Sequence, residues 1–425
     1  MILLFMLLLS FLLMVLGMPI AFSLGISSLF YIFFSDLSLA NLTFKLALST
    51  GSYPMLAIPL FMLAGKLMNR GGITDRIYQF ALDLVGHIRG GLGHVNVLVS
   101  ILFAGMSGSV LADVAGLGEI EMKSMNEAGY DKDFSMGVTL ASSAIGPIFP
   151  PSVPMVIFGV IAEVSIPGLF LGGFLPGLLI AACLMTFIVI ISRKRDYQTT
   201  PFPPLSRLLK SFVYAFPSIM TPVIIVGGMT LGVFSPTEAA AVAVLYCLFL
   251  GIAIYRKLRL KDIRETVVET VISTSKLMFV IATALLFGYI LTIEEVPQKT
   301  AELLVSMSSN TWLVLLIINV VLLLLGAIIE NAILLLVLAP ILVPAVTELG
   351  VDPLQFGVMM VFNIMIGQYT PPMGLSLYIM KDISGLSFER VCRAAFPFLI
   401  PLVFALLLIT YIPEIVLTVP RFFGY

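Results

Sequence analysis

The sequence predicts an all-α polytopic membrane protein built as an inverted repeat, with two re-entrant hairpins and two broken helices. Three observations lead to this prediction: the composition, the spacing of the apolar runs, and a set of short motifs that recurs at one offset. Of the 425 residues, 60% are hydrophobic and only 11% are charged. Soluble domains use about a quarter charged residues, so this chain is too apolar to be one.

Charge and cysteine usage exclude further classes of protein. The net charge is −1, and the basic residues gather in short loops rather than on one face, which argues against a nucleic-acid partner. Cys183, Cys247 and Cys392 lie far apart, in or beside apolar runs. We therefore expect packed or lipid-facing thiols, with neither a disulfide nor a metal site.

Twelve apolar runs follow one another along the chain, and most are long enough to cross a hydrocarbon core of roughly 30 Å. The first run begins at once, without a basic segment or a convincing cleavage site, so we interpret it as a span rather than a signal peptide. The runs cover residues 2–16, 19–35, 52–69, 95–120, 134–162, 167–192, 212–234, 237–255, 268–293, 311–346, 354–380 and 394–418.

Basic residues orient these runs, because short cytoplasmic loops carry an excess of Lys and Arg. Glu163, Glu294 and Glu295 fall on the opposite side. The orientation is consistent only if runs 95–120 and 311–346 each enter and leave the membrane on one side. The sequence thus predicts two re-entrant hairpins, ten full spans and both termini outside. The predicted cytoplasmic residues are Lys66, Arg70, Arg76, Arg89, Arg193, Lys194, Arg195, Arg207, Lys210, Arg256, Lys257, Arg259, Lys261, Arg264, Lys381, Arg390 and Arg393.

An internal repeat relates the two halves of the chain. Gly105 matches Gly326 at an offset of 326 − 105 = 221 residues. Each half has five full spans and one hairpin, and this odd number of crossings places the second copy in the opposite orientation. Such inverted repeats are typical of secondary transporters. Further matches at this offset are Ile145-Gly146 with Ile366-Gly367, Pro150-Pro151 with Pro371-Pro372, and Glu127-x-Gly129-x-Asp131 with Glu348-x-Gly350-x-Asp352.

The repeat divides the chain into scaffold segments, arms and two halves of a transport domain. The arm stretches are mildly amphipathic, so we expect interfacial helices there, with plain loops as the alternative. Each transport half contains one hairpin and one broken span. The segments are 1–70 and 193–293 (scaffold, the second with a cytoplasmic loop), 71–94 and 294–310 (arms), and 95–192 and 311–425 (transport domain).

Each half combines a glycine-bearing hairpin tip with a span that two prolines interrupt. Proline removes a backbone donor and clashes with the carbonyl four residues back, so we expect unwound backbone at Pro150-Pro151 and Pro371-Pro372. Free carbonyls there can replace the hydration shell of Na⁺. The matched copies indicate two Na⁺ sites that flank one substrate site, and plain kinks in packed helices are the alternative. Because no G-x-x-x-x-G-K-[ST] loop occurs, uphill transport must draw on an ion gradient or another subunit.

Ionisable side chains near the hairpins are candidates for function, because a charge at membrane depth is costly. Asp113 follows Ser109 by four residues and would share its helical face. Glu330 and Asn331 lie near the second tip. A position at the aqueous mouth of a hairpin is the alternative for these residues. The acidic residues near span ends, which we interpret as caps and interface residues, are Glu127, Asp131, Glu348 and Asp352.

An enzymatic alternative comes from Gly105-x-Ser107-Gly108, which matches the short G-x-S-G pattern of intramembrane serine proteases. Ser107 would be the nucleophile, and His87 or His94 would be the base. Both histidines lie in the polar stretch before the hairpin rather than on a separate apolar helix. The second half has no matching serine. Transport that survives Ser107→Ala while proteolysis is lost would favour this alternative.

Three motifs resemble the large membrane subunit of TRAP transporters (tripartite ATP-independent periplasmic transporters). They are F-x-G-x-S-G-S at 103–109, S-P-T-E-A-A at 235–240 and G-Q-Y-T-P-P-M-G at 367–374, and the resemblance covers essentially the whole chain. It implies an elevator-type fold of the ion transporter superfamily and Na⁺-driven uptake of an organic acid across the bacterial inner membrane. It also implies two partners, a periplasmic substrate-binding protein and a small membrane subunit of four helices.

The resemblance also implies roles for single residues. One Na⁺ would lie between Ser107-Gly108 and the broken span at Gly146 and Phe149. An acidic Asp113 would accept hydrogen bonds from hydroxyl or amide groups, which favours a polyhydroxylated acid such as sialic acid over a C4-dicarboxylate. A binding-protein-independent Na⁺/dicarboxylate symporter of the same fold is the alternative. The second Na⁺ would involve Gly326, Gly367, Thr370 and Met373, and the substrate would contact Ser109, Asp113 and Ser152.

Overall fold

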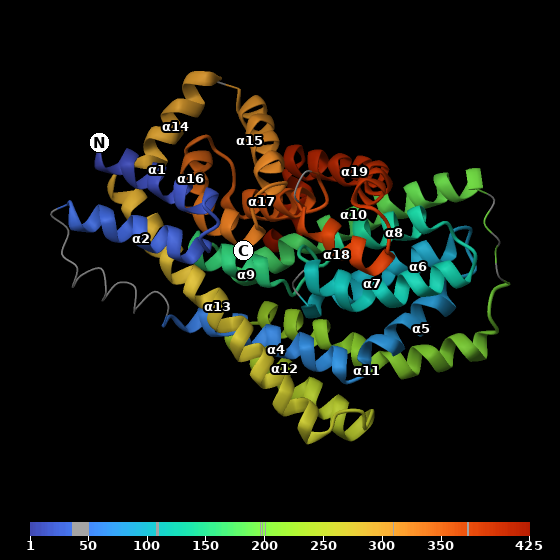
Figure 1. Cartoon of the computed structure of the whole chain (residues 1–425). Helices are drawn as coiled ribbons and strands as arrows, with labels where there is room; N and C mark the ends of the chain where they lie inside the picture. The colour runs from blue at the N-terminus through green and yellow to red at the C-terminus, as the bar shows by residue number, and fades with distance from the viewer. Residues whose placement is uncertain are drawn as a thin grey trace.

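The computed structural model describes residues 1–35, 51–107, 110–195, 197, 199, 201–308, 310–371 and 374–425. Within these ranges the regular structure is entirely helical (Figure 1). The side chains at 104–107, 110–113, 115–117, 305 and 307 are outside the description as well. Among the predicted site residues, Gly108, Ser109 and Met373 therefore lie outside the described residues, and Ser107 and Asp113 are placed by their backbone alone.

Helices of the first half follow the apolar runs closely. Short 3₁₀ turns occur at Tyr53–Leu56 and Ser143–Ile145, where prolines or helix ends interrupt the regular ladder. The helices are α1 (Ile2–Val15), α2 (Ile20–Phe33), α4 (Ala57–Arg70), α5 (Ile73–Val85), α6 (Gly91–Ser107), α7 (Val110–Glu127), α8 (Lys132–Ser142), α9 (Val153–Ile161) and α10 (Ile166–Arg195).

The second half has a similar order of helices. A π-turn at Leu250–Ile254 extends the helix before it. The helices are α11 (Leu205–Thr230), α12 (Pro236–Phe249), α13 (Leu260–Ile293), α14 (Val296–Met307), α15 (Thr311–Gly326), α16 (Asn331–Glu348), α17 (Pro353–Gly367), α18 (Leu375–Ser384), α19 (Phe388–Tyr411) and α20 (Pro413–Phe422).

Six described helices are long and apolar enough to cross a bilayer. They are α10, α11, α12 with its π-turn, α13, α16 and α19, and α1, α2, α15 and α17 are shorter apolar helices. Large apolar side chains face outward from several of them, for example Phe11, Val213 and Leu231, which are 67%, 67% and 76% exposed. A surface of this kind fits a hydrocarbon environment, so the chain spans the membrane several times. The number of ten full spans stays a prediction.

Both apolar runs that were expected to form hairpins contain two helices. The run 95–120 divides into α6 and α7, and 311–346 divides into α15 and α16, whose ends are separated by residues 327–330. The helices of each pair contact one another. The predicted helix breaks at both Pro-Pro motifs are present too, because α8 and α9 are separated by residues 143–152, and α17 and α18 by residues 368–374.

One predicted span is wrong in its extent. The run 394–418 is two helices, since α19 ends at Tyr411 and α20 begins at Pro413. Ile412 between them has φ −121° and ψ 87°, outside the helical region. A residue before proline is disfavoured in the α conformation, and Pro413 has no N–H to continue the ladder. The chain therefore turns at Ile412, which hydropathy alone does not reveal.

Two of the acidic residues near span ends, Asp131 and Asp352, occupy the N-cap positions of α8 and α17. Asp352 begins α17, and its carboxylate accepts from the Leu354 amide at 2.9 Å. Asp131 begins α8 with extended backbone, and its carboxylate accepts from Tyr197 at 2.8 Å and Arg195 at 2.6 Å. The Tyr197 hydrogen bond, together with Arg195, holds the pKa of Asp131 below its usual range. The cap interpretation is confirmed for Asp352, whereas Asp131 forms no side-chain cap hydrogen bond and pairs with Tyr197 and Arg195 instead.

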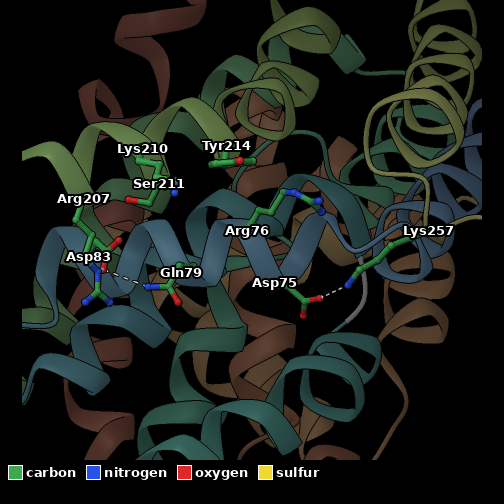
Figure 2. Close-up of a pocket in the computed structure, with 9 residues that line it drawn as sticks. All are labelled: Asp75, Arg76, Gln79, Asp83, Arg207, Lys210, Ser211, Tyr214 and Lys257. Carbon is green, nitrogen blue, oxygen red and sulfur yellow. Dashed lines mark hydrogen bonds and ion pairs between the residues drawn. The ribbon is translucent and has the colours of Figure 1, made fainter.

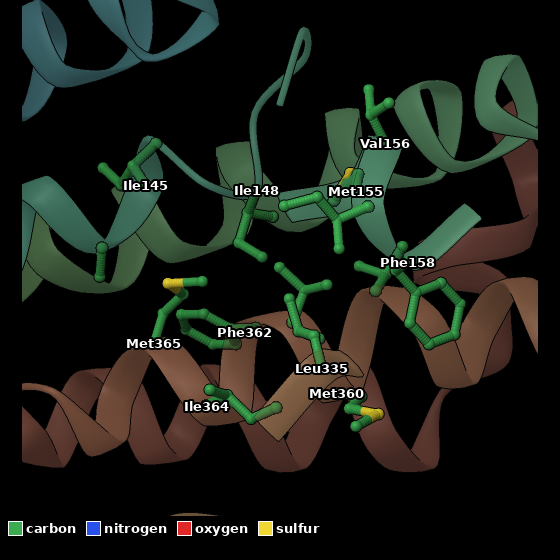
Figure 3. Close-up of a cluster of buried hydrophobic side chains, with 14 of the residues drawn as sticks. Ile145, Ile148, Met155, Val156, Phe158, Leu335, Met360, Phe362, Ile364 and Met365 are labelled. Carbon is green, nitrogen blue, oxygen red and sulfur yellow. The ribbon is translucent and has the colours of Figure 1, made fainter. Parts of the chain in front are cut away.

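The core lies where the two halves of the chain meet (Figure 3). Ile145, Ile148 and Phe158 from the first half face Phe362 and Met365 from the second, and each is at most 2% exposed. α9 contacts both α16 and α17. Close packing of these side chains fixes the positions of the two helix breaks relative to each other.

The remaining helices frame this core. α13 runs diagonally across the molecule and contacts α2 and α4, while α5 lies along α11 (Figure 1). α12 begins with a capping box, in which Ser235 and Glu238 hydrogen-bond each other's backbone amides. Thr237 then donates to the Tyr53 carbonyl at 2.7 Å. The motif at 235–240 thus starts one helix and attaches it to the segment before α4.

Candidate functional site

The first helix break places unwound backbone inside the protein. After the turn at Ser143–Ile145, regular structure resumes only at Val153. Three prolines in this interval lack an N–H, which explains why the helix does not continue. Among the described residues, no backbone amide donates to the carbonyls of Gly146, Ile148 or Phe149. These are free acceptors of the kind that a cation needs in a water-poor site.

Ser152 closes the first break. Its hydroxyl donates to the Pro147 carbonyl and accepts from the Met155 amide at 3.3 Å, so it caps α9. The residue is 0% exposed. In this conformation both hydrogen bonds of the hydroxyl are used within the protein. Ser152 shapes the loop here, and its predicted substrate contact stays a prediction.

Glycines on α10 let the first break pack closely against that helix. A Cβ on Gly173 would lie 2.1 Å from the Ile148 carbonyl oxygen, and one on Gly177 would lie 2.8 Å from the ring of Phe149. The Phe149 ring also packs against Phe174, with centroids 5.3 Å apart. The side chain of Phe149 therefore faces α10, so its contribution to an ion site would come from its carbonyl.

The second break is also unwound backbone whose carbonyls lie close together. Thr370 donates its hydroxyl to the Ile366 carbonyl at 3.0 Å. A Cβ on Gly374 would lie 2.2 Å from the Gln368 carbonyl oxygen and 3.1 Å from that of Thr370. Two backbone carbonyls thus converge where only glycine fits. Met373, predicted to join them, lies outside the described residues.

The tip of the second hairpin touches the second break through backbone. A Cβ on Gly367 would lie 2.5 Å from Cα and C of Gly326, and one on Gly326 would lie 3.1 Å from the Ile364 carbonyl oxygen. No side chain separates the two segments at this point. The structure thus brings together two of the residues predicted for the second Na⁺ site.

Glu330 and Asn331 begin α16 just beyond this tip. Asn331 is buried and donates its amide to the sulfur of Met365 at 2.8 Å, while its side-chain oxygen has no donor among the described residues. Thioether sulfur is a weak acceptor, so this amide is poorly satisfied by the protein alone. An unpaired buried oxygen beside unwound backbone is the arrangement that a small cation would complete.

The first hairpin is described less fully. α6 ends at Ser107 and α7 begins at Val110, and both helices contact the 3₁₀ turn that precedes Gly146. The described helices of the first hairpin therefore pack against the turn at the start of the first break, and the Na⁺ site at Ser107 and Gly108 stays a prediction. Asp113 falls within the first turn of α7. The positions of Gly108 and Ser109 lie outside the described part of the chain.

Sequence reasoning missed a direct link between the two breaks. The hydroxyls of Ser143 and Tyr369 lie 3.1 Å apart, and Tyr369 is 2% exposed. Ser143 precedes the first break, and Tyr369 lies within the second. A buried tyrosine usually has a hydrogen-bond partner for its hydroxyl. A tyrosine within an unwound apolar motif was therefore a signal in the sequence that such a partner exists.

Buried asparagines also escaped the prediction. Asn96 on α6 donates to Thr139 on α8 at 3.0 Å. In the second half, Asn363 on α17 donates to the side-chain oxygen of Asn319 on α15 at 2.6 Å, and Asn319 donates to Thr410 at 3.1 Å. Each hairpin is thus hydrogen-bonded to its own broken helix. An asparagine in an apolar run is itself a signal of a helix–helix contact.

The donor set favours a hard cation that prefers oxygen ligands over a transition metal. Within the described ranges, no group of three or more His, Cys, Asp or Glu residues could hold a metal ion. Both breaks offer carbonyl, hydroxyl and amide oxygens instead. Oxygen ligands suit hard cations, whereas zinc and copper sites use nitrogen and sulfur. The residues present therefore fit Na⁺ better than zinc or copper.

Comparison with known proteins places the chain in one family. Residues 7–415 match the family model described as tripartite ATP-independent periplasmic transporter, DctM component. The chain is 45% identical over 411 residues to the sialic acid TRAP transporter large permease protein SiaM of Vibrio cholerae, covering 96% of each chain. It is 41% identical over 403 residues to the C4-dicarboxylate TRAP transporter large permease protein DctM of Pseudomonas aeruginosa, covering 95% of this chain and 94% of that one.

A solved structure shares the fold. The YdaH transporter of Alcanivorax borkumensis, described as having an unusual topology, superposes with a TM-score of 0.69 and 13% identity, covering 89% of both chains. Because the curated relatives are named transporter permeases, the chain is a transporter subunit rather than an intramembrane protease. On the strength of a match that spans nearly its whole length, the chain belongs to the large permease family of the tripartite ATP-independent periplasmic transporters.

Proposed function

We propose that this subunit imports an organic acid across the bacterial inner membrane in symport with Na⁺. A periplasmic binding protein would deliver the acid, and a small membrane subunit of four helices would brace the scaffold. The family and the multi-pass architecture support this proposal. Such a protein acts by alternately opening one internal site to each side of the membrane.

One observation carries the Na⁺ part of the proposal: two helix breaks with free or converging carbonyls, each packed against a hairpin. The first Na⁺ would lie among Ser107, Gly108, Gly146 and Phe149. Unwound carbonyls supply oxygen ligands without fixed negative charge, which suits an ion that must bind and leave in every cycle. The second Na⁺ would lie among Gly326, Gly367, Thr370 and Met373.

The transported acid is proposed to be sialic acid or a C4-dicarboxylate, with sialic acid favoured. The 45% identical relative is named for sialic acid and the 41% identical one for C4-dicarboxylates. Ser109, Asp113 and Ser152 are the proposed contacts. A carboxylate at 113 would repel a second acid group of the substrate, whereas it accepts hydrogen bonds from hydroxyls.

The mechanism is proposed to be an elevator built on an inverted repeat. α7 and α16 begin 331 − 110 = 221 residues apart, and they end 348 − 127 = 221 residues apart. Gly129 and Gly350 share the left-handed conformation, with φ of 81° and 80°. An apolar cavity of 380 Å³ separates α6, α10 and α20 from α11. Such a poorly filled boundary supports a sliding contact between a moving part and a scaffold.

A reconstituted uptake assay tests the proposal. The full chain and its small subunit are placed in proteoliposomes with an inward Na⁺ gradient, and labelled sialic acid or succinate is added with its purified binding protein. We expect uptake of one acid that requires both Na⁺ and the binding protein. Uptake that persists in K⁺ or choline medium contradicts Na⁺ coupling. Uptake without any binding protein instead supports the independent Na⁺/dicarboxylate symporter.

A further inference from the structure

A charged groove of 490 Å³ lies between the arm helix α5 and α11 (Figure 2), and none of its lining residues belongs to either helix break. It is bordered on one side by the loop before α13, which contributes Lys257. The nine lining residues are Asp75, Arg76, Gln79, Asp83, Arg207, Lys210, Ser211, Tyr214 and Lys257. All its basic residues belong to stretches that the sequence predicts to be cytoplasmic.

Two ion pairs bind the arm to its neighbours across this groove. Lys257 pairs with Asp75 at 2.8 Å, and Arg207 pairs with Asp83 at 3.0 Å. Asp83 is only 3% exposed and also accepts from Gln79 at 3.2 Å. Both carboxylates of the groove are therefore already neutralised, one at each end of α5.

Two further cations of the groove have no acidic partner among the residues that the structure describes. Arg76 places its guanidinium over the ring of Tyr255, 3.6 Å from the centroid, and donates to the Gly72 carbonyl at 2.7 Å. Lys210 forms no ion pair among the described residues. With four cations and two carboxylates, the groove has a net charge of 4 − 2 = +2.

The neighbouring surface is apolar and faces outward. Leu209, Val213 and Phe216 of α11 are 55%, 67% and 45% exposed, directly beside the basic residues of the same helix. Tyr214 lines the groove and is 56% exposed. A ligand here would meet positive charge at its polar end and hydrocarbon-compatible surface alongside. Phospholipids combine these two properties, and basic grooves between helices on the cytoplasmic side bind their headgroups.

We propose that this groove binds the phosphate of an anionic membrane phospholipid, which holds the arm helix α5 against α11. Lys210 supplies the unpaired charge, Arg76 lies beside it, and Tyr214 offers a hydroxyl donor. The acyl chains would follow the exposed apolar surface of α11. The site depends on the membrane location of the chain and not on which solute the protein carries.

Lipid titration of the delipidated full chain tests this proposal. Dioleoyl-phosphatidylglycerol is added in a neutral detergent, and bound lipid is counted by native mass spectrometry. Thermal unfolding is followed in a Cys183→Ala, Cys392→Ala background with a thiol-reactive fluorophore, which then reports exposure of the buried Cys247. We expect phosphatidylglycerol, but not dioleoyl-phosphatidylcholine, to bind and to raise the unfolding temperature. Equal effects of the two lipids overturn the proposal.

Matched variants localise the binding. Lys210→Gln should weaken phosphatidylglycerol binding about fivefold, because one basic residue near anionic lipid contributes that much. Lys210→Arg should keep the affinity. Lys194→Gln removes an exposed charge at the end of α10, outside the groove, and should change nothing. The proposal fails if Lys210→Gln and Lys194→Gln bind phosphatidylglycerol equally well.

Two further arms exclude other occupants. Glycerol phosphate carries the same anionic group without acyl chains, and we expect no stabilisation at matched concentration. Stabilisation as strong as with phosphatidylglycerol would make the groove a site for soluble phosphate compounds. The titration is repeated on the complex with the small subunit. A Lys210-dependent effect that disappears there would show that an acidic protein segment occupies the groove and would overturn the lipid assignment.

Discussion

At the scale of single residues, two glycines bring the second hairpin and the second break into direct backbone contact. Gly326 ends the first limb of one hairpin, and Gly367 ends the first part of the second broken helix. Their backbones come so near that a methyl group on Gly367 would lie 2.5 Å from Gly326. Two segments from different parts of the chain thus meet through backbone atoms alone.

Gly367→Ala should therefore impair the protein in two measurable ways. The added methyl group forces the hairpin tip away from the break, which costs about 1–3 kcal/mol of stability. It also separates the proposed Na⁺ ligands, so the Na⁺ concentration for half-maximal uptake should rise. Gly227→Ala on α11 is the control, because a Cβ there meets nothing within 4 Å. Identical Na⁺ dependence in both variants would contradict the proposed second Na⁺ site.

The sequence indicated some of these residues and not others, for physical reasons. Gly326 and Gly367 could be identified because each has a counterpart 221 residues away. The Ser143–Tyr369 contact could not, since it joins positions that are not counterparts and depends on how the two halves pack. The internal hydrogen bonds of Ser152 were also invisible in the sequence, because serine after Pro-Pro is equally suited to capping or to ligand binding.

At the scale of elements, buried amides tie each hairpin to its broken helix. In the second half, Asn319, Asn363 and Thr410 form a chain of hydrogen bonds across α15, α17 and α19. Gln355 adds a bond to the Thr410 carbonyl at 2.9 Å. Polar contacts between membrane helices determine which helix faces meet, because apolar side chains pack about equally well against lipid and against another helix.

A double-mutant cycle should show that Asn319 and Asn363 act together. Asn363→Leu leaves the Asn319 oxygen without its donor, at a cost of about 1–3 kcal/mol. The double variant with Asn319→Leu should lose less stability than the two single variants combined, with a coupling energy of about 0.5–3 kcal/mol. Asn319→Leu combined with Asn96→Leu, which belongs to a separate cluster, should be additive. Additivity in both pairs, measured by thermal unfolding, would refute the linkage.

Element boundaries were predictable where local chemistry decides them. The Pro-Pro motifs specify breaks through a missing N–H and a steric clash, so both breaks occur where expected. Hydropathy, by contrast, joined α19 and α20 into one run, because Ile412 and Pro413 are as apolar as their neighbours. Helix ends in the second half therefore depend on single prolines as well as on average hydrophobicity.

At the scale of the whole molecule, one boundary separates α11 from α6, α10 and α20. The apolar cavity of 380 Å³ along it is lined by Phe174 of α10 and by Val223 of α11. The first break borders the same cavity through Phe149 and Pro150, while its Ile148 carbonyl packs tightly against Gly173 of α10. The proposed moving part and scaffold would meet along this cavity.

Cross-linking across this boundary should stop transport. Phe174 and Val223 are replaced by cysteine in a background without the three native cysteines and joined with a bifunctional maleimide. If α10 moves past α11, cross-linked protein should lose uptake while still binding substrate. The matched pair is Phe174→Cys with Val419→Cys on α20, which lines the same cavity but would move with α10. Full uptake after complete cross-linking of positions 174 and 223 would sink the elevator proposal.

The length of α13 has a mechanical consequence. Its 34 residues contain no proline and extend about 51 Å, and even at a tilt of about 40° they rise about 39 Å, beyond a hydrocarbon core of about 30 Å. One end is held by Arg70, which pairs with Glu265 at 3.2 Å, and at the other end Tyr31 donates to Glu294. The helix is thus attached to neighbouring helices near both of its ends. A displacement of one end of α13 therefore moves the other end, on the opposite side of the bilayer, because the helical backbone between them is continuous.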